Sequence, residues 1–180
     1  MSWVDKGDAM TFITLADLAE RLGAVELAQV AQQPGEPVAS PAVLAMLMRG
    51  EDMSAVPEAE ANVARAAAER ISDVMEEAQA LAEGYLRQGG YPLPLPRVPL
   101  ILKGWTRAIV RYRLHAHRLS DEKSDPIVRD YRDALNLLGL VAAGKFSLGL
   151  GDTRPPAGGR PAVSGPGRTF SMDSLRDYGK

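Results

Sequence analysis

One long amphipathic segment constrains the fold of this chain more than any other feature. It begins after Pro57 and continues to about Arg87 without a proline, which as a helix is about 45 Å at 1.5 Å per residue. Apolar side chains recur on one face at helical spacing, and acidic side chains lie opposite. Because that face is rich in alanine, a second helix can approach closely, so the segment predicts a tight bundle. The predicted apolar face comprises Val63, Ala64, Ala67, Ile71, Val74, Ala78, Leu81, Ala82 and Tyr85.

Start and stop signals predict helices before this segment. Thr14 and Asp17 have capping-box spacing, so a helix begins there and ends at Gly23. A shorter helix follows to about Ala31. A further short helix is predicted over 40–50, because a Ser-Pro pair opens it and a glycine closes it.

Two more helices are predicted after it, at about 100–119 and 125–144, and a proline-rich connector over 91–99 precedes them. Asp125, followed by a proline, is the predicted cap of the second. No stretch of useful length alternates as a strand does. We therefore predict an all-α fold, a bundle of about four main helices plus one short helix at 40–50. The side chains expected in its core include Trp105, Tyr112, Ile71, Leu81, Tyr131 and Leu138.

The last thirty residues have a different composition. Prolines and glycines are dense over 151–167, which supports no core, so we expect a helical domain at 1–150 and an extended Gly/Pro-rich C-terminal arm at 151–180. The arm ends in a compact motif at 168–178. Because this motif has no local core, we expect it to dock on another subunit. The side chains expected to make that contact are Arg168, Phe170, Leu175, Arg176 and Tyr178.

Composition excludes several classes of protein. The chain has no cysteine, so disulfides, thiol chemistry and the common structural zinc sites are excluded. Its net charge is −2, which argues against a protein whose main affinity is for nucleic acid. No stretch has the length and apolarity of a membrane span, and the first residues lack the order of a signal peptide. We expect no cofactor and no metal.

Charge is nevertheless unevenly distributed. Residues 84–120 contain seven Lys and Arg but no acid, whereas 51–83 contain nine acids. On a helix, the cations form one stripe, which is either a solvated face, a partner for the acidic helix, or a surface that touches phosphates. His115 lies on the same stripe. We call its cations Lys103, Arg107, Arg111 and Arg118 the basic stripe, and Glu69, Asp73, Glu76 and Glu77 the acidic face.

Signals for catalysis are weak. Residues 139–146 match a phosphate-binding P-loop except at the last position, where Phe146 stands in place of the hydroxyl residue that should reach magnesium. We interpret this segment as the end of a helix, with Lys145 near its negative pole. His115 and His117 point in different directions on a helix and cannot share a metal unaided. The sequence therefore predicts no enzyme.

The order of these pieces resembles the Mu-like head-to-tail connector family of tailed bacteriophages. The matching segments are 12–23, 84–95, 109–114, 143–149 and 167–178, of which Gly-Tyr-Leu with Tyr-Pro-Leu-Pro-Leu and the tail Phe-Ser-Met-Asp-Ser-Leu-Arg are specific. The resemblance implies a structural subunit of a ring of about twelve copies at the neck of the virion, assembled in the host cytoplasm. Implied partners are the portal protein, the next neck or tail component, and packaged DNA that passes without sequence readout. The alternative is a helical nucleic-acid-binding protein that uses the basic stripe.

Overall fold

The computed structural model describes residues 11–32, 34–116 and 125–150, and this part of the chain is all-helical. The predicted C-terminal arm lies outside the described residues. Six helices follow one another: α1 (Leu15–Arg21), α2 (Ala24–Val30), α3 (Pro41–Arg49), α4 (Glu58–Gln88), α5 (Leu100–His115) and α6 (Pro126–Ala142). The predicted fold class is confirmed. The two predicted N-terminal helices are α1 and α2, each of seven residues, and they are separated at Gly23, whose φ is 88°.

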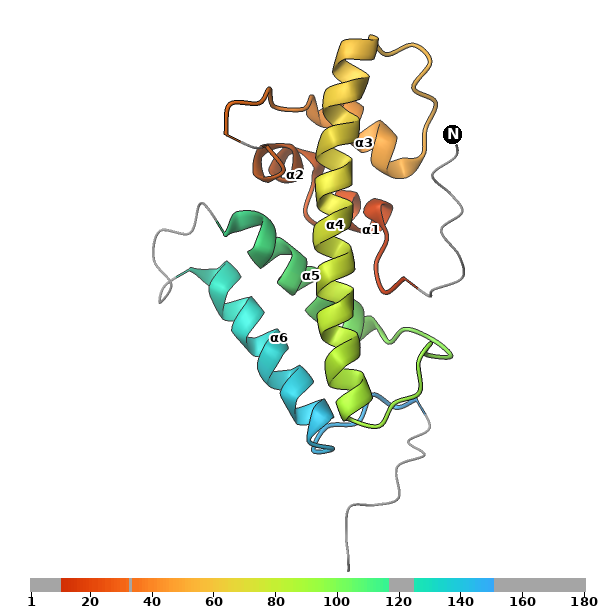
Figure 1. Cartoon of the computed structure of the whole chain (residues 1–180), viewed down its shortest axis with the longest axis vertical. Coiled ribbons are helices and arrows are strands. Elements are labelled where there is room, and N and C mark those ends of the chain that lie inside the picture. The colour runs from red at the N-terminus through yellow and green to blue at the C-terminus, as the bar shows by residue number, and fades with distance from the viewer. Residues whose placement is uncertain (1–10, 33, 117–124, 151–180) are drawn as a thin grey trace, which may run out of the picture.

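Helix α4 is the central element, and α1, α3, α5 and α6 pack along it (Figure 1). Helices α1, α2 and α3 contact one another, and α3 packs against α4. Helices α5 and α6 pack together and also against α4. The molecule therefore has two groups of helices that share one 31-residue helix.

The predicted start and stop signals act as expected at several ends. The capping box of α1 is complete: Asp17 N–H donates to Thr14 Oγ1 and Thr14 N–H donates to Asp17 Oδ2, each at 3.1 Å. Asp125 accepts a hydrogen bond from Ile127 N–H at 2.8 Å and caps α6. Gly50 closes α3 in the left-handed conformation, with a φ of 72°.

The core is formed mainly by aliphatic side chains, with alanines along α4. Ile71, Trp105 and Leu138 are buried, as predicted. Gly89 lies where the ends of α4 and α6 meet, and a Cβ atom there would come within 2.9 Å of the Val141 carbonyl oxygen. Only a residue without a side chain permits this approach.

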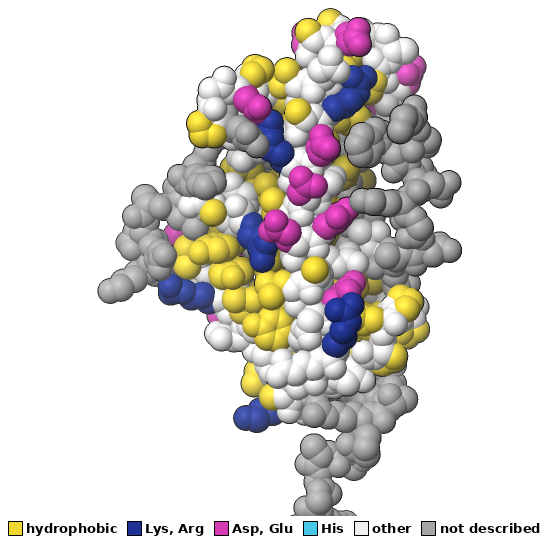
Figure 2. Space-filling model, in the orientation of Figure 1, with side chains coloured by type: hydrophobic (Ala, Val, Ile, Leu, Met, Phe, Trp, Pro, Cys, Tyr) yellow, Lys and Arg dark blue, Asp and Glu magenta, His cyan; other side chains and the backbone are white. Residues whose placement is uncertain are grey.

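Three predicted core residues are only half-buried: Leu81, Tyr112 and Tyr131. The two tyrosine rings stack on each other, with centroids 3.9 Å apart and planes within 4°. Each ring covers one face of the other, and the rest of each tyrosine side chain is partly open to water. Figure 2 shows apolar side chains gathered on the surface in the region where α4, α5 and α6 meet.

The buried face of α4 is also rotated from the predicted one. Val63, Val74 and Tyr85 lie at its edge and are half-buried, whereas Met75 and Leu86 are buried. The rotation has a physical cause, because α4 packs against α3 on one part of its length and against α5 and α6 on another.

Two ends of the described chain are fixed to other elements. Phe12 is 1% exposed, and its N–H donates to the Gln79 side chain on α4 at 3.1 Å. At the other end, Leu148 N–H donates to the Tyr91 hydroxyl and Arg97 donates to the Gly149 carbonyl, both at 3.2 Å. The segment that leads to Leu150 is thus bound to the proline-rich connector between α4 and α5.

Candidate functional site

The basic stripe is the predicted site that the structure describes best. Lys103, Arg107 and Arg111 lie on successive turns of α5, and Arg118 lies outside the described residues. Val110 and Leu114 interrupt the stripe in the sequence. Val110 is fully buried and Leu114 packs against the core. This side of α5 is therefore partly covered by protein.

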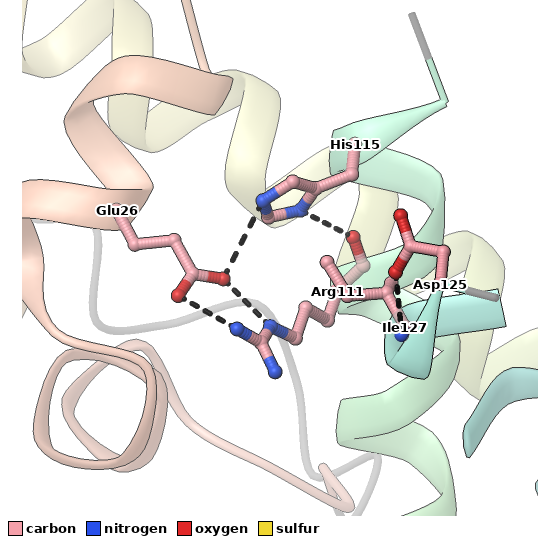
Figure 3. A network of polar contacts seen from close by, with 5 residues as sticks. All are labelled: Glu26, Arg111, His115, Asp125 and Ile127. Atoms are coloured by element: carbon pink, nitrogen blue, oxygen red, sulfur yellow. Dashed lines mark hydrogen bonds and ion pairs between the residues drawn. The ribbon is translucent and has the colours of Figure 1, made fainter. Parts of the chain in front are cut away.

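Arg111 is held by α2. Its Nε lies 2.7 Å from Glu26 Oε1 and a second guanidinium nitrogen lies 3.0 Å from Glu26 Oε2 (Figure 3). Two parallel bonds of this kind fix both the distance and the orientation of a guanidinium. The hydrogen bond to Glu26 raises the pKa of Arg111, burial acts against this, and the charges of Glu26, Asp130 and Asp125 add to it.

His115 extends the same contact. Its Nδ1 lies 2.9 Å from the Arg111 carbonyl oxygen, and its Nε2 lies 3.6 Å from Glu26 Oε1 (Figure 3). Because a carbonyl oxygen only accepts, the Nδ1 atom carries the hydrogen in this bond. Glu26, Arg111 and His115 therefore form one polar cluster that joins α2 to the C-terminal part of α5.

Lys103 is held by α1. Its Nζ lies 3.7 Å from Asp17 Oδ2, the carboxylate that also accepts from the Thr14 N–H in the capping box. The Thr14 backbone hydrogen bond lowers the pKa of Asp17, desolvation raises it, and the charge of Lys103 lowers it further. One carboxylate thus both caps α1 and binds α5.

Arg107, between these two cations, differs from both. Its Nε atom is buried and, within the described part of the chain, has no hydrogen-bond partner. No ion pair of Arg107 with the described residues is found either. Among the three described members of the basic stripe, Arg107 is the one without an acidic partner in the described part of the chain.

The acidic face lies along the solvent side of α4, where Figure 2 shows a column of acidic side chains. All four of its residues are exposed. Glu77 pairs with Arg113, a residue of α5 outside the basic stripe. The structure therefore does not bring the basic stripe and the acidic face together within one chain, since the partners of the stripe are Asp17 and Glu26.

Sequence reasoning missed these two partners. Asp17 gave a signal only as a capping residue, and Glu26 gave none, because its partner is 85 residues away in the sequence. The arm residues Arg168, Phe170, Leu175, Arg176 and Tyr178 lie outside the described residues.

The P-loop match belongs to a helix end, as interpreted from the sequence. Gly139 lies inside α6, and Gly144 follows the helix with a φ of 70°. Phe146, at the position of the missing hydroxyl, packs edge-on against Trp105 with ring centroids 5.7 Å apart. The described residues contain no cluster of three or more side chains that could hold a metal ion, and none of their helices has the length and apolarity to cross a membrane. His117 lies outside them.

Comparison with known proteins decides the family. A family model described as "Bacteriophage Mu, Gp36" matches residues 12–164. The chain belongs to this family. The match includes every described helix and both partners of the basic stripe. Comparisons with curated proteins and with solved structures found no match. Family membership indicates a phage structural or morphogenesis protein, associated with the virion.

Proposed function

We propose that this phage protein is a head-to-tail connector subunit of a tailed virion. In this proposal about twelve copies form a ring at the neck, below the portal protein, and the ring offers a platform to the next neck or tail component. Packaged DNA passes through it without sequence readout. The protein is structural and has no catalytic role, and it assembles in the host cytoplasm. The observation that carries the proposal is the family match over residues 12–164.

The partners of the basic stripe support a structural role over nucleic-acid binding. A protein that binds DNA mainly through phosphates needs cations that are free to replace counterions. Lys103 and Arg111 are already paired with Asp17 and Glu26 inside the chain. Within the described stripe, Arg107 is then the one cation without an acidic partner. One cation is too few for strong binding to phosphates.

The second candidate is a helical nucleic-acid-binding protein that uses Lys103, Arg107, Arg111 and Arg118. The observation in its favour is that Arg107 has no acidic partner among the described residues. Affinity for duplex DNA as a function of salt separates the two candidates, because each phosphate neutralised steepens the salt dependence by about one unit of slope.

Two measurements test the connector. The first is the mass of the assembled particle, with and without the neighbouring neck protein, for which a connector gives a closed ring of defined copy number. The second compares Arg107→Glu with the matched reversal Arg129→Glu on α6. We expect Arg107→Glu to reduce ring formation more than it changes DNA binding. Intact rings with lost DNA affinity would instead support the second candidate.

A further inference from the structure

An open hollow lies between α2, the connector that leads to α3, and the N-terminal half of α4. Its volume is about 270 Å³ and its lining is mostly apolar. Small side chains, Ala28, Ala39, Ala66 and Ala67, form much of the wall. Arg70 stands at the hollow and is held there, because its guanidinium donates to the Ala31 carbonyl at 2.6 Å and pairs with Glu36.

An exposed apolar knob lies at the start of α5. Leu100 is 84% exposed, the highest value among the exposed large apolar side chains of the described chain, and Ile101 beside it is 42% exposed. Leu102, the next residue, is fully buried and fixes this end of the helix to the core. The knob is therefore held on a rigid element.

The hollow and the knob lie on different sides of α4. In Figure 1 the connector between α2 and α3 is on the left of α4, whereas α5 begins on the right. One chain cannot bring them together, but two copies placed side by side can. A contact between two different surfaces of identical subunits is head-to-tail, and repeated rotation closes it into a ring.

Charge around the two features is complementary. Near the knob, Arg97 lies three residues before Leu100 and Arg107 lies two helical turns after it, and neither pairs with an acid of the described residues. The α4 surface that runs from the hollow carries exposed acids, including Glu58, Glu60 and Glu69. Opposite charge across a contact fixes its orientation and suppresses wrong pairings.

We infer that Leu100 of one copy inserts into the hollow of the next copy and forms the apolar centre of the subunit interface. This inference rests on the proposed ring and names its contact. The volume of the hollow equals that of roughly nine water molecules in the liquid, at about 30 Å³ each. This is enough space for one leucine side chain, with Ile101 against the wall. Burying a leucine of this exposure strengthens each contact by roughly 10- to 100-fold.

Cysteine cross-linking tests the contact directly, since the natural chain has no cysteine. The full chain is made with Leu100→Cys and Ala66→Cys together, and it is oxidised under mild conditions. A disulfide forms only where Cα atoms come within about 7 Å. We expect a ladder of covalent oligomers that ends at the ring number. A mixture of the two single variants should stop at the covalent dimer, because each chain then carries one cysteine and can form only one disulfide.

The matched control combines Leu100→Cys with Leu140→Cys, on an exposed residue of α6. A ladder from the control as strong as from the test pair would overturn the inference, because it would reflect random collisions. A wild-type chain that forms rings in light scattering, together with a test pair that gives no ladder, overturns this contact but leaves the ring. A wild-type chain that stays monomeric under all conditions removes both. Circular dichroism checks that every variant is folded.

Discussion

The guanidinium of Arg111 donates two hydrogen bonds to the carboxylate of Glu26 and so joins α5 to α2. Both side chains are about one-quarter to one-third exposed, at 25% for Glu26 and 36% for Arg111, so water screens part of their attraction. We expect Glu26→Gln to lower the free energy of unfolding by about 1 kcal/mol, measured by urea denaturation. Glu69→Gln, on an exposed residue of α4, should change it by less than about 0.5 kcal/mol. Equal effects of the two substitutions would mean that the Arg111 contact contributes nothing.

Asp17 gives a pH dependence whose sign follows from its lowered pKa. Unfolded aspartate titrates near pH 3.9, so the contribution of Asp17 is fully present above about pH 4 and is lost as the pH falls through the lower folded value. The effect should be below about 1 kcal/mol, because the side chain is more than one-third exposed. Asp17→Asn should therefore lower stability at pH 6 and have less effect at pH 2.5. An effect of Asp17→Asn that does not diminish on acidification would contradict this account.

Tyr112 and Leu138 should differ in their cost of truncation. Leu138 is fully buried, and Leu138→Ala should cost about 3 kcal/mol or more. Tyr112 is half-buried and stacks on Tyr131, so Tyr112→Ala should cost about 2 kcal/mol. The expected loss is smaller than the loss of about 3 kcal/mol or more that is expected for a fully buried tyrosine. Chemical denaturation of both variants measures the order, and a larger cost for Tyr112 would show that the stack holds α5 and α6 together more strongly than the aliphatic core does.

Local signals explain which parts of the fold were predictable. The capping box of Thr14 and Asp17, the proline that opens α3 and the cap of α6 at Asp125 act within a few residues, so the sequence identifies them. The side of α4 that is buried depends on four partner helices, α1, α3, α5 and α6. A periodic pattern within α4 carries no information about where those partners lie. This is why the predicted apolar face omits Met75, which is buried, and includes Tyr85, which is half-buried.

The candidate site was less predictable for the same reason. The basic stripe follows from helical spacing alone. Its partners Asp17 and Glu26 come from helices more than eighty residues earlier, and no local pattern connects them. The hollow is lined by alanines from separate elements, which individually predict only close packing.

The C-terminal arm should act in assembly and not in folding. Deletion of residues 169–180 removes Phe170, Leu175 and Tyr178, which have no local core in the sequence. We expect a helical protein with unchanged thermal stability that fails to join heads to tails in a complementation assay. Normal assembly by the truncated chain would reduce the arm to a spacer.

Lys145 should be dispensable. It follows the end of α6, where its N–H donates to the Leu140 carbonyl at 2.8 Å, and the adjacent Phe146 packs on Trp105. We expect Lys145→Ala to leave assembly and stability unchanged within about 0.5 kcal/mol. Nucleotide hydrolysis by the purified protein that vanishes in this variant would contradict both the helix-end interpretation and the structural role.

Helix α4 is 31 residues long, which is about 46 Å at 1.5 Å per residue. The hollow is built on its first half, and the helix α5 that carries Leu100 packs against it. A shared, unbroken rod gives the knob and the hollow a fixed mutual direction, so every copy adds the same turn to a growing assembly. A twelvefold ring needs about 30° per copy. The closure angle of the particle would then be a property of one chain, set before any neighbour arrives.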